Sequence, residues 1–415
     1  MDDLENMNNI SFEQFENLFS KVRGAVTVSD ENRDRIRLAF ATQDGMRSKF
    51  ATPDIADHRR RIREEDCAVR TAFQRDLGRI IYSQSFRRLK HKTQVFFNPV
   101  NDHICSRLEH VIYVNYISQV IGGALNLNKD LIQAIALGHD IGHTPFGHSG
   151  ERMLSKKLKE KDSRLFFEHE AHSLRVLDVL EKHNDSFGLN LTFEVRDGIL
   201  SHCGEAYNEN VIVPVRDKKQ EELTYLVPKK ERRGPATLEG CVVKMADKIA
   251  YVGRDIEDAL RMGIVNDDYF VSGEGKYLGT SNAEIINSLV EDVIENSFNK
   301  DEIRLSAKTG EALAGILDQN LNKIYKATKI TTYERYADLI VASLFDTFMD
   351  ALEKREPGVE PANEMIRKFF GFVDDHPQKD DPEDLMPLPI YVSDYIAGMT
   401  DGFAIQCFDA LFREC

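Results

Sequence analysis

The sequence has no closely spaced cysteine pair and no long apolar run. Its six cysteines are scattered over 415 residues without a CxxC motif, and a chain of this length does not need disulfides for stability, so we interpret them as reduced thiols. No stretch of about 18 apolar residues occurs, and the first segment, MDDLENMNNISFEQF, has neither the basic nor the apolar region of a signal peptide. We therefore expect a cytoplasmic protein that does not span a membrane.

Basic residues are scarce relative to acidic ones, and the formal net charge is −15. This charge argues against non-specific binding to DNA or to acidic membranes, although a local basic pocket can still bind a phosphate. The apolar share of 42% and the charged share of 30% are ordinary for a folded protein, and 415 residues exceed the usual size of a single hydrophobic core. The composition predicts one large body with a smaller lobe.

From about residue 65 onward, apolar residues recur at the three- and four-residue spacing of helices. Residues 205–235 break this pattern with short β-branched runs between turn and charged residues, which predicts a hairpin or a long loop. Helical spacing returns over residues 238–260, and a turn cluster at 272–282 precedes further helical segments. Residues 374–387 are acidic and contain prolines, so we expect a loop there.

These patterns predict an all-α protein with a helical core, an additional C-terminal helical lobe, and a short β-hairpin or loop insertion. We divide it into a helical lead-in (1–64), the core (65–265) and the C-terminal lobe (266–415). The charged run HRRRIREED at 58–66 is interpreted as a solvated surface segment.

Histidine is concentrated in one region, because nine of the twelve histidines lie between residues 103 and 202. Within it, His139 and Asp140 are adjacent, and both side chains could reach one cation if a helix ends at that point. Gly142 and Pro145 supply such an end. This segment is the strongest candidate for a metal site.

Two other segments carry candidate ligands that are weaker alone. His110 lies in an otherwise apolar helical segment, where a lone histidine is more often a core residue than a ligand. Asp247, Tyr251 and Asp255 are spaced by four on one predicted helix, with Lys248 beside them, so they share one face. That face is either a solvated acidic stripe or part of a site, and the upstream His-Asp pair favours the site.

A mixed set of histidine and aspartate favours Mg²⁺, Mn²⁺ or another transition metal over a structural zinc ion, because neither HExxH nor a thiolate cluster is present. Such an ion polarises a phosphoryl oxygen and lowers the pKa of a bound water. His143 and His148 follow across a Thr-Pro break and could line the same cleft. Either could protonate a leaving alkoxide, or could simply hydrogen-bond to a neighbouring carboxylate.

In the order of these residues the sequence resembles the HD superfamily of phosphohydrolases, whose pattern is a histidine, a His-Asp pair and a distant aspartate. The pattern falls on His110, His139, Asp140 and Asp247. Five segments are more specifically similar to the dGTPase-like deoxynucleoside triphosphate triphosphohydrolases, a branch that includes the animal sterile-alpha-motif HD enzymes. They are SFRRLKHKTQVF (85–96), SRLEHVIYV (106–114), GHDIGHTPFGHSGE (138–151), FEHEAHSLRVL (167–177) and MADKIAYVGRDIEDA (245–259).

The resemblance implies an HD-domain core that hydrolyses deoxynucleoside triphosphates (dNTPs), dGTP among them, to the deoxynucleoside and inorganic tripolyphosphate. Water would attack the α-phosphorus, and the four residues of the pattern would hold a divalent metal ion, Mn²⁺, Mg²⁺ or another transition metal.

The resemblance also assigns roles to further residues. It implies catalytic roles for His148, Glu151 and His169, with Glu151 orienting His148 and with His169 near the phosphates. The substrate-binding residues that we predict are Gln94, Val95, Arg107, His143, Lys248, Tyr251 and Asp255. Among these, Arg107, Lys248 and Tyr251 would contact the triphosphate, which suits the cationic side chains of the first two. Gln94 and Asp255 would bind the sugar 3′-hydroxyl, and Val95 would pack under the ribose and exclude a 2′-hydroxyl.

One segment departs from the family pattern. In FEHEAHSLR, Glu170 and His172 stand where many bacterial relatives are expected to have asparagine and glutamine. The substrate preference around His169 therefore does not transfer from the family.

Other functions fit parts of this pattern. An HD phosphodiesterase or phosphatase, acting on a nucleoside monophosphate, a cyclic dinucleotide or an alarmone, would keep the four ligands but would not need Gln94 or Tyr251. A non-catalytic dNTP-binding sensor or scaffold would not need His148. A purely structural role would bury many histidines without partners, which is costly.

The resemblance also suggests partners. Relatives commonly form hexamers or tetramers, and some are activated by dNTPs, so we expect a homo-oligomer and consider a dNTP effector. Binding of single-stranded DNA would rest on the run KKERR at 229–233, which is more typical of a solvated loop.

Overall fold

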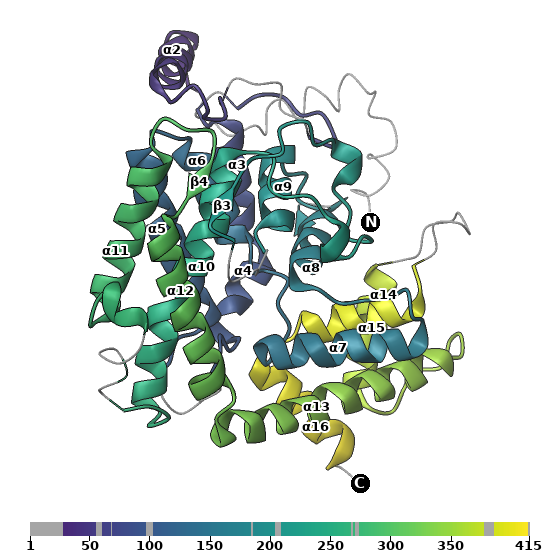
Figure 1. Cartoon of the computed structure of the whole chain (residues 1–415). Helices are drawn as coiled ribbons and strands as arrows, with labels where there is room; N and C mark the ends of the chain where they lie inside the picture. Colours follow the sequence, from purple (N-terminus) through teal and green to yellow (C-terminus); the bar gives the residue numbers. More distant parts are fainter. Residues whose placement is uncertain are drawn as a thin grey trace, which may run out of the picture.

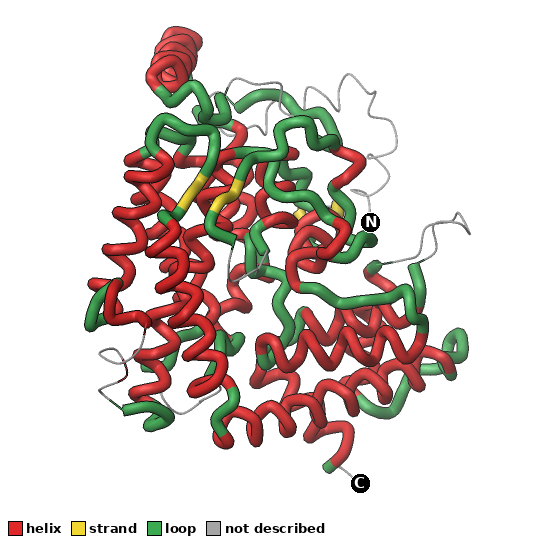
Figure 2. The backbone as a smooth tube through the Cα atoms, viewed as in Figure 1, coloured by secondary structure: helices red, strands yellow, loops and turns green. Residues whose placement is uncertain are grey.

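The protein is described from a computed structural model, in residues 28–54, 60–67, 69–96, 103–183, 186–203, 209–266, 269, 274–376 and 386–413. Helices make up most of this part of the chain, and its strands are only two residues long (Figure 2). The prediction of an all-α fold is confirmed. Much of the predicted lead-in and most of the predicted loop at 374–387 lie outside the described residues.

Fifteen α-helices follow one another along the described part of the chain, and the longest connection described in part lies between α9 and α10 (Figure 1). The α-helices are α2 (Asp30–Met46), α3 (Ala72–Tyr82), α4 (Gln84–Arg88), α5 (Arg107–Ala124), α6 (Lys129–Gly138), α7 (Gly147–Lys161), α8 (His169–Arg175), α9 (Phe193–Ser201), α10 (Leu238–Arg261), α11 (Asn282–Ser297), α12 (Ala307–Asn320), α13 (Thr328–Glu353), α14 (Glu364–Asp375), α15 (Leu388–Ala397) and α16 (Asp401–Phe412). The short 3₁₀ and π turns are η2 (Leu89–His91), η3 (Val176–Leu180), η4 (Gln220–Glu222), η5 (Lys229–Glu231), η7 (Glu274–Tyr277) and η8 (Leu321–Tyr325).

Two small antiparallel pairs complete the described secondary structure. Strand β1 (Lys182–His183) pairs with β2 (Ser186–Phe187). Strand β3 (Val211–Ile212) pairs with β4 (Ile303–Arg304), far away in the sequence. The segment predicted as a hairpin or loop is therefore a loop in its described part, because its one strand pairs outside the segment.

Side-chain caps fix where two important helices begin. Thr71 and Gln74 form a reciprocal capping box at the start of α3, and Ser106 and Glu109 form another at the start of α5. In each box the hydroxyl accepts from a backbone N–H of the first turn, and the acidic or amide side chain accepts from the N-cap N–H. The second box sets the register of α5, and thereby the face on which His110 lies.

One large buried apolar cluster joins α3, α5 and α6 with α9–α12. Helix α10 runs through it, and its Val242, Met245 and Ile249 side chains are completely buried. This packing brings α5, α6 and α10 together, although they are far apart in the sequence. The four predicted metal ligands come from these three helices and from the end of α6.

A second buried cluster joins α7 with the C-terminal helices α13–α16 (Figure 1). Leu154 and Leu158 of α7 contribute to it, as do Phe345 and Phe348 of α13. Helix α7 therefore links the two halves of the chain. The division of the chain at residues 64 and 265 stays a prediction.

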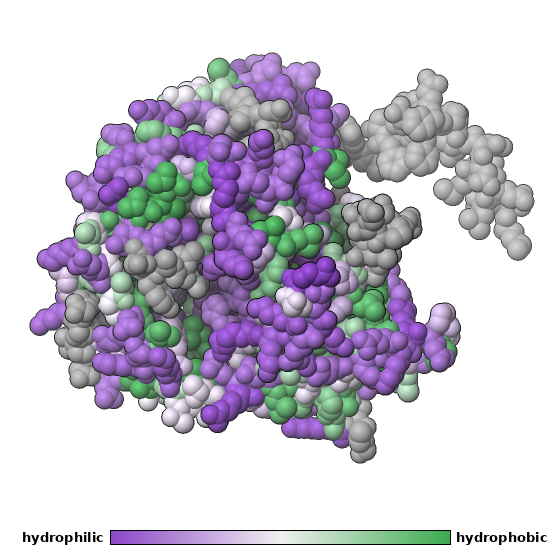
Figure 3. Space-filling view, turned by 45° about the vertical axis from the view of Figure 1, so that its right-hand side comes forward, coloured by the Kyte–Doolittle hydropathy of each residue, from purple (hydrophilic) through white to green (hydrophobic). Residues whose placement is uncertain are grey.

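The surface seen in Figure 3 is mostly hydrophilic, with apolar side chains in scattered groups. Helix α2 has no buried residue and stands off the body at its top in Figure 1. Among the described residues, no helix is both long enough and apolar enough to cross a membrane.

Candidate active site and metal centre

The candidate metal ligands converge from three helices that are far apart in the sequence. His110 lies on the buried face of α5, His139 and Asp140 follow the end of α6, and Asp247 lies on α10. His110 Nε2 is 2.9 Å from Asp247 Oδ1, and His139 Nε2 is 3.8 Å from the same oxygen. The structure thus brings all four predicted ligands into one buried cluster.

His139 is held so that one ring nitrogen faces this cluster. Helix α6 ends at Gly138, and the Nδ1 atom of His139 lies 2.7 Å from the carbonyl oxygen of Ala136 in its last turn. The Nε2 atom is fully buried and has no hydrogen-bond partner among the described residues. A hydrogen bond behind one ring nitrogen, with the other left open, is typical of a metal-binding histidine.

Asp140 contacts the guanidinium of Arg107 through one carboxylate oxygen and histidine rings through the other. Arg107 Nη1 donates to its Oδ2 atom at 2.6 Å, while its Oδ1 atom lies 3.2 Å from His143 Nε2 and 3.5 Å from His139 Nε2. Burial raises the pKa of Asp140, but the neighbouring His143 and Arg107 outweigh burial and hold the pKa well below its usual range. The carboxylate is therefore charged, and Oδ1 is the oxygen that faces the cluster.

Neighbouring side chains shift the pKa values of the two other candidate ligands, Asp247 and His110, in opposite directions. Burial opposes ionisation of Asp247, but the hydrogen bond from His110 and the nearby histidines lower its pKa below the usual range. Burial lowers the pKa of His110 as well, but Asp247 and Asp140 raise it above its ordinary value. Both carboxylates of the cluster are therefore ionised, as ligands for a metal ion must be.

A second polar group adjoins this cluster. His148 Nδ1 lies 3.2 Å from Glu151 Oε2, both on α7, and His169 Nδ1, at the start of α8, lies 3.1 Å from Glu151 Oε1. His143 stacks on His169 with ring centroids 3.9 Å apart. The side chain of His148 is 54% exposed, whereas His143 and His169 are buried. His148 is thus the histidine of this group that faces solvent.

The two stacked histidines, His143 and His169, differ in protonation state. Burial lowers the pKa of His143 well below its usual value, and the charge of Arg107 lowers it further, so the ring is neutral. Burial acts in the same direction on His169, but Glu170 and Glu151 raise its pKa to about 10, so that this ring is protonated. Conversely, His169 and His148 lower the pKa of Glu151 well below its usual range, although burial raises it.

The loop between the His-Asp pair and α7 is closely fitted to α8. Gly142 N donates to Ser173 Oγ at 2.9 Å, and Ser173 Oγ donates to the carbonyl oxygen of His139 at 2.7 Å. A Cβ atom on Gly142 would lie 2.1 Å from the backbone nitrogen of Ser173. Two residues at the start of α7 have left-handed conformations, the N-cap Phe146 with φ 62° and the first helical residue Gly147 with φ 58°. The predicted break after the His-Asp pair is therefore a tight turn.

The predicted substrate-binding residues lie around the cluster, and they differ in the hydrogen bonds and packing contacts that they make. Arg107 is buried and its other guanidinium nitrogens donate to the carbonyl oxygens of Thr93 and Gln94 at 3.2–3.3 Å. The side-chain oxygen of Gln94 is buried without a hydrogen-bond partner among the described residues, and the half-buried Val95 packs against the first apolar cluster. These contacts place the segment 93–95 beside Asp140.

Three other predicted substrate-binding residues, Lys248, Tyr251 and Asp255, lie on α10, as their spacing in the sequence predicts. Lys248 donates to the carbonyl oxygen of Glu209 at 3.3 Å, and burial lowers its pKa. Tyr251 is half-buried, one turn beyond Asp247. Asp255 is buried and accepts a hydrogen bond from the hydroxyl of Tyr325; burial raises its pKa to about 7 in spite of that bond.

Two further residues at the cluster were not predicted from the sequence. His202 follows the end of α9, and its ring lies 4.8 Å from that of His139 between centroids. Cys203 Sγ lies 3.2 Å from His169 Nε2. Burial, and the nearby His139 and His169, lower the pKa of His202 to about 3. The only signal in the sequence is the adjacent His202 and Cys203 after an apolar helical segment, and this pair has no recognisable ligand spacing.

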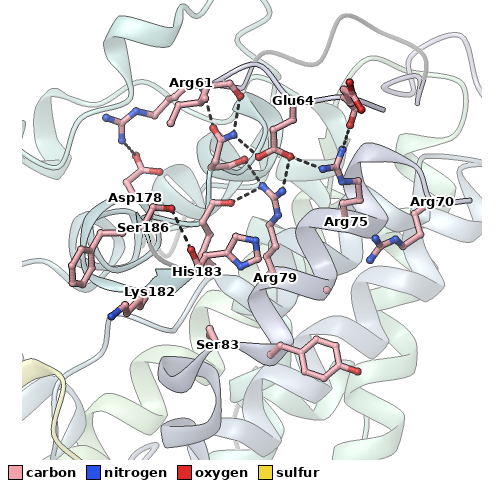
Figure 4. A pocket seen from close by; sticks show the side chains of 18 residues that line it. Arg61, Glu64, Arg70, Arg75, Arg79, Ser83, Asp178, Lys182, His183 and Ser186 are labelled. Atoms are coloured by element: carbon pink, nitrogen blue, oxygen red, sulfur yellow. Dashed lines mark hydrogen bonds and ion pairs between the residues drawn. The ribbon is translucent and has the colours of Figure 1, made fainter. Parts of the chain in front are cut away.

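A separate hollow in the described structure contains none of the predicted site residues. It measures about 1050 Å³ and lies between α3, the segment 61–65 and the β1–β2 hairpin. Figure 4 shows Arg75 and Arg79 converging on Glu64 in its wall, where Glu64 Oε2 accepts from both at 2.5 and 2.6 Å. The chemistry of the histidine cluster, and not the size of a cavity, identifies the candidate site.

The cluster is suited to a divalent cation. His110, His139 and Asp247 form one group whose ligand atoms all lie within 4.8 Å of one another, and His139 and Asp140 share a second such group with His202. Imidazole nitrogens and carboxylate oxygens are ligands for Mn²⁺, Fe²⁺, Co²⁺ and related ions. The unpartnered, buried Nε2 atom of His139 is the position that an ion would satisfy.

Comparison with known proteins gives two family matches and a series of relatives. The HD domain family matches residues 107–252, and the phosphohydrolase-associated domain matches residues 303–410. A deoxyguanosinetriphosphate triphosphohydrolase-like protein of Caldanaerobacter subterraneus is 39% identical over 88% of this chain and 92% of its own length. Proteins with the same description from Desulfatibacillum aliphaticivorans and Rickettsia bellii are 36% and 32% identical over 88% of this chain and 94% and 98% of their own.

The chain belongs to the deoxyguanosinetriphosphate triphosphohydrolase-like family. Members of this family are HD-domain phosphohydrolases, and the resemblance read from the five sequence segments is confirmed. The HD match begins at Arg107, at the first residue of α5, and ends at Val252 on α10. It therefore spans the four candidate ligands, while the second match runs from β4 through α12 into α16 and so includes the C-terminal helices of the second apolar cluster.

Proposed function

We propose that this triphosphohydrolase-like protein hydrolyses dNTPs, dGTP among them, to the deoxynucleoside and inorganic tripolyphosphate. In this reaction water adds to the α-phosphorus, the bond between that phosphorus and the 5′-oxygen breaks, and the leaving oxygen takes up a proton. The observation that carries the proposal is the unpartnered Nε2 atom of His139 beside the buried carboxylate of Asp140 and the half-buried carboxylate of Asp247, next to the His148–Glu151–His169 group. The printed descriptions of the relatives support the substrate class.

His110, His139, Asp140 and Asp247 would hold one divalent cation, of which Mn²⁺ and Mg²⁺ are the expected examples. When bound, such an ion polarises a phosphoryl oxygen and lowers the pKa of a bound water. His139 is fixed for this role through Ala136. Arg107 orients Asp140 through Oδ2, which leaves Oδ1 to face the ion.

His148 would give the proton to the leaving 5′-oxygen. Its ring is held through Nδ1 by Glu151, which leaves Nε2 for proton exchange, and it is the most exposed residue of its group. Glu151 would orient both His148 and His169.

The triphosphate would be neutralised by positive charge on several elements. Protonated His169 lies at the centre of the group, Lys248 and Tyr251 lie on α10, and we keep Arg107 among the phosphate-binding residues. His143, neutral and stacked on His169, would line the same wall. These groups would act on charge that develops as the bond to phosphorus breaks.

The sugar would be bound by Gln94 and Asp255, with Val95 packing under it. The unpartnered amide oxygen of Gln94 can accept a hydrogen bond from the 3′-hydroxyl. Asp255 can donate or accept, since burial raises its pKa to about 7. A residue of the size of Val95 under the ribose leaves no room for a 2′-hydroxyl, which would favour deoxynucleotides.

The homo-oligomeric state, the dNTP effector, binding of single-stranded DNA and the cytoplasmic location stay predictions. The segment 229–233, on which DNA binding would rest, includes Arg232, which is paired with Glu168, and Arg233, which is paired with Asp217. Such pairing reduces the positive charge that this loop offers to a polyanion.

The test is hydrolysis of each of the four dNTPs by metal-free protein with and without Mn²⁺ or Mg²⁺, with products separated by ion-exchange chromatography. Asp140→Ala and His148→Ala should each lower kcat by at least about 100-fold. His183→Ala, on β1 and outside the cluster, is the control and should keep full activity. Orthophosphate or pyrophosphate as the product would indicate an HD phosphatase or phosphodiesterase instead, and tight dNTP binding without any product would indicate a sensor.

A further inference from the structure

We infer that the hollow between α3, the segment 61–65 and the β1–β2 hairpin binds an oligophosphate anion, at a place separate from the histidine cluster (Figure 4). The hollow measures about 1050 Å³, which is enough for a ligand of nucleotide size. Its described lining contains none of the residues assigned above to the metal centre or to the dNTP. An anion would therefore bind here whether or not the histidine cluster holds a metal ion.

The described lining has an excess of positive charge. It contains five cationic side chains and three acidic ones, in a chain whose formal net charge is −15. The cationic side chains are Arg61, Arg70, Arg75, Arg79 and Lys182, and the acidic ones are Glu64, Glu65 and Asp178. A cationic hollow in an otherwise acidic protein concentrates anions at one place.

Two of the acidic side chains are each shared between two guanidinium groups. Glu64 Oε2 accepts from two arginines of α3, at 2.5 and 2.6 Å. Asp178 accepts from Arg196, which lies outside the lining, at 2.5 and 2.8 Å, and Arg61 lies only within 3.5 Å of the same carboxylate. Neither carboxylate can neutralise both of its partners, so positive charge remains in the wall.

Two cations of the lining have no carboxylate partner among the described residues. Arg70 Nε donates to Cys67 Sγ at 3.4 Å, and Lys182 Nζ lies over the Phe187 ring, 5.9 Å from its centroid. Both cationic side chains are exposed. An anion can bind to them without breaking an ion pair, and a guanidinium can hold two phosphoryl oxygens at once.

The positive charge also acts on His183, in the wall of the hollow. Partial burial and the charge of Arg79 lower the pKa of His183 below its ordinary value, and Arg75 lowers it further, although Glu64 raises it. Arg79 has a larger effect on this ring than Glu64 has. The potential at this point of the wall is therefore positive.

The cations lie on two sides of the hollow, which favours an extended anion. In Figure 4, Arg70 and Arg75 lie on one side, Arg61 and Lys182 lie on the other, and Arg79 lies between them. A chain of phosphoryl groups can contact both sides at once. It also carries more than one negative charge, as the excess of cations requires.

Exposed aromatic side chains in the lining allow two sources of this anion. Tyr82 is 76% exposed and Phe187 is 42% exposed. Their rings could pack on the ring of a phosphate ester. The anion is therefore either a free inorganic oligophosphate or the phosphate chain of such an ester.

The experiment is isothermal titration calorimetry of the metal-free full chain with two probes, inorganic tripolyphosphate and adenosine 5′-triphosphate. Wild type should bind tripolyphosphate, with an affinity that falls as salt is added. Arg70→Gln and Lys182→Gln should each raise the Kd at the hollow by at least about 10-fold. Both changes are at exposed side chains, so the fold should persist, and circular dichroism checks this.

Three further variants show whether the effect belongs to the hollow. Lys182→Arg keeps the charge and should bind nearly as wild type does. Lys49→Gln is the matched control, because Lys49 is also exposed over a ring, 4.8 Å from the centroid of Phe50, but lies outside the lining. Asp140→Ala alters the histidine cluster alone. The last two variants should both leave the Kd at the hollow unchanged.

The second probe identifies the source. Tighter binding of adenosine 5′-triphosphate than of tripolyphosphate, weakened in the same two variants, would support the site and assign it to a phosphate ester with a ring. Equal or weaker binding would assign it to an inorganic oligophosphate. If neither Arg70→Gln nor Lys182→Gln weakens a binding event, or if Asp140→Ala abolishes all binding, the anion binds elsewhere and the inference is overturned. An absence of binding to wild type would overturn it as well.

Discussion

At the scale of single residues, the site depends on how closely two backbone segments approach. The turn after His139 and Asp140 lies against α8, and Gly142 fills the contact because it has no side chain. Ser173 bridges the two segments through one hydroxyl, which accepts from Gly142 and donates to His139. The orientation of the His-Asp pair is therefore set by a glycine and a serine that take no part in the chemistry.

Gly142→Ala should separate these segments, because the new Cβ atom would meet backbone rather than a movable side chain. We expect a loss of about 1–3 kcal/mol in the free energy of unfolding, measured by urea denaturation, together with reduced metal binding. Gly123→Ala is the matched control, since nothing lies within 4 Å of its Cβ position on α5. It should be neutral or stabilising by up to about 1 kcal/mol, and an equal loss in both variants would contradict the account.

Glu64 gives a prediction on pH. Partial burial raises its pKa, but hydrogen bonds from Arg79 and Asn190 lower it to about 2, below the value of 4.5 expected in the unfolded chain (Figure 4). The folded state therefore binds fewer protons, so this carboxylate stabilises the fold fully above about pH 4.5 and loses its effect as the pH falls toward 2.

Glu64→Gln should accordingly be less stable than wild type near neutral pH, and the difference should shrink below about pH 4.5. Thermal unfolding at a series of pH values measures it, with the exposed Glu65→Gln as the control. A difference that grows as the pH falls would contradict the sign.

At the scale of elements, periodicity predicted which segments are helical, and the four-residue spacing of Asp247, Tyr251 and Asp255 predicted their shared position on α10. It did not predict burial in every case. Ile112 and Tyr116 on α5 have apolar helical spacing, yet they are 49% and 65% exposed. Spacing fixes the face of a helix, but only the packed neighbours decide what covers that face.

For polar residues, too, the sequence alone does not predict which side chains are buried or which contacts they make. Arg60, in a run interpreted as solvated, is buried on Asp76 at 2.6 Å, because a distant helix supplies its partner. His202 and Cys203 escaped prediction because their partners, His139 and His169, come from other helices. The sequence could predict ligands that match a known pattern, and could not predict contacts that only the tertiary packing creates.

The packing of α7 on α13 gives the prediction at this scale. Phe348 is completely buried in the second apolar cluster, and Phe348→Ala should lower the free energy of unfolding by about 3–5 kcal/mol. Phe412→Ala, at a side chain that is 45% exposed, should cost much less. Denaturant unfolding of the two variants compares them, and a loss in Phe348→Ala as small as that in Phe412→Ala would mean that this cluster does not stabilise the fold.

At the scale of the whole molecule, the C-terminal helices hold the loops of the site. Asp401 on α16 accepts hydrogen bonds from the backbone nitrogens of Thr93 and Phe146, each at 2.9 Å. Lys92 is buried and donates to the carbonyl oxygen of Ala397 at 2.7 Å and to that of His143. The segment before Gln94 and the turn before α7 are therefore both tied to the same distant helices.

Asp401→Asn should loosen the loops, since Thr93 N and Phe146 N donate to different carboxylate oxygens, and an amide keeps only one of these two acceptors and turns an N–H donor toward the other N–H. We expect kcat to fall by roughly 10-fold or more through misplacement of Gln94 and His148. Asp409→Asn on the same helix, where the partner is the exposed Arg413, is the control. Full activity in Asp401→Asn would show that these ties do not position the site.

The central claim is that water attacks the α-phosphorus of a dNTP. Its most direct test is hydrolysis of dGTP by the metal-loaded protein in water enriched in ¹⁸O, followed by mass spectrometry of both products. The account predicts one ¹⁸O atom in tripolyphosphate and none in deoxyguanosine. Label in orthophosphate or pyrophosphate, or in the sugar of deoxyguanosine, would place the attack elsewhere and contradict the account.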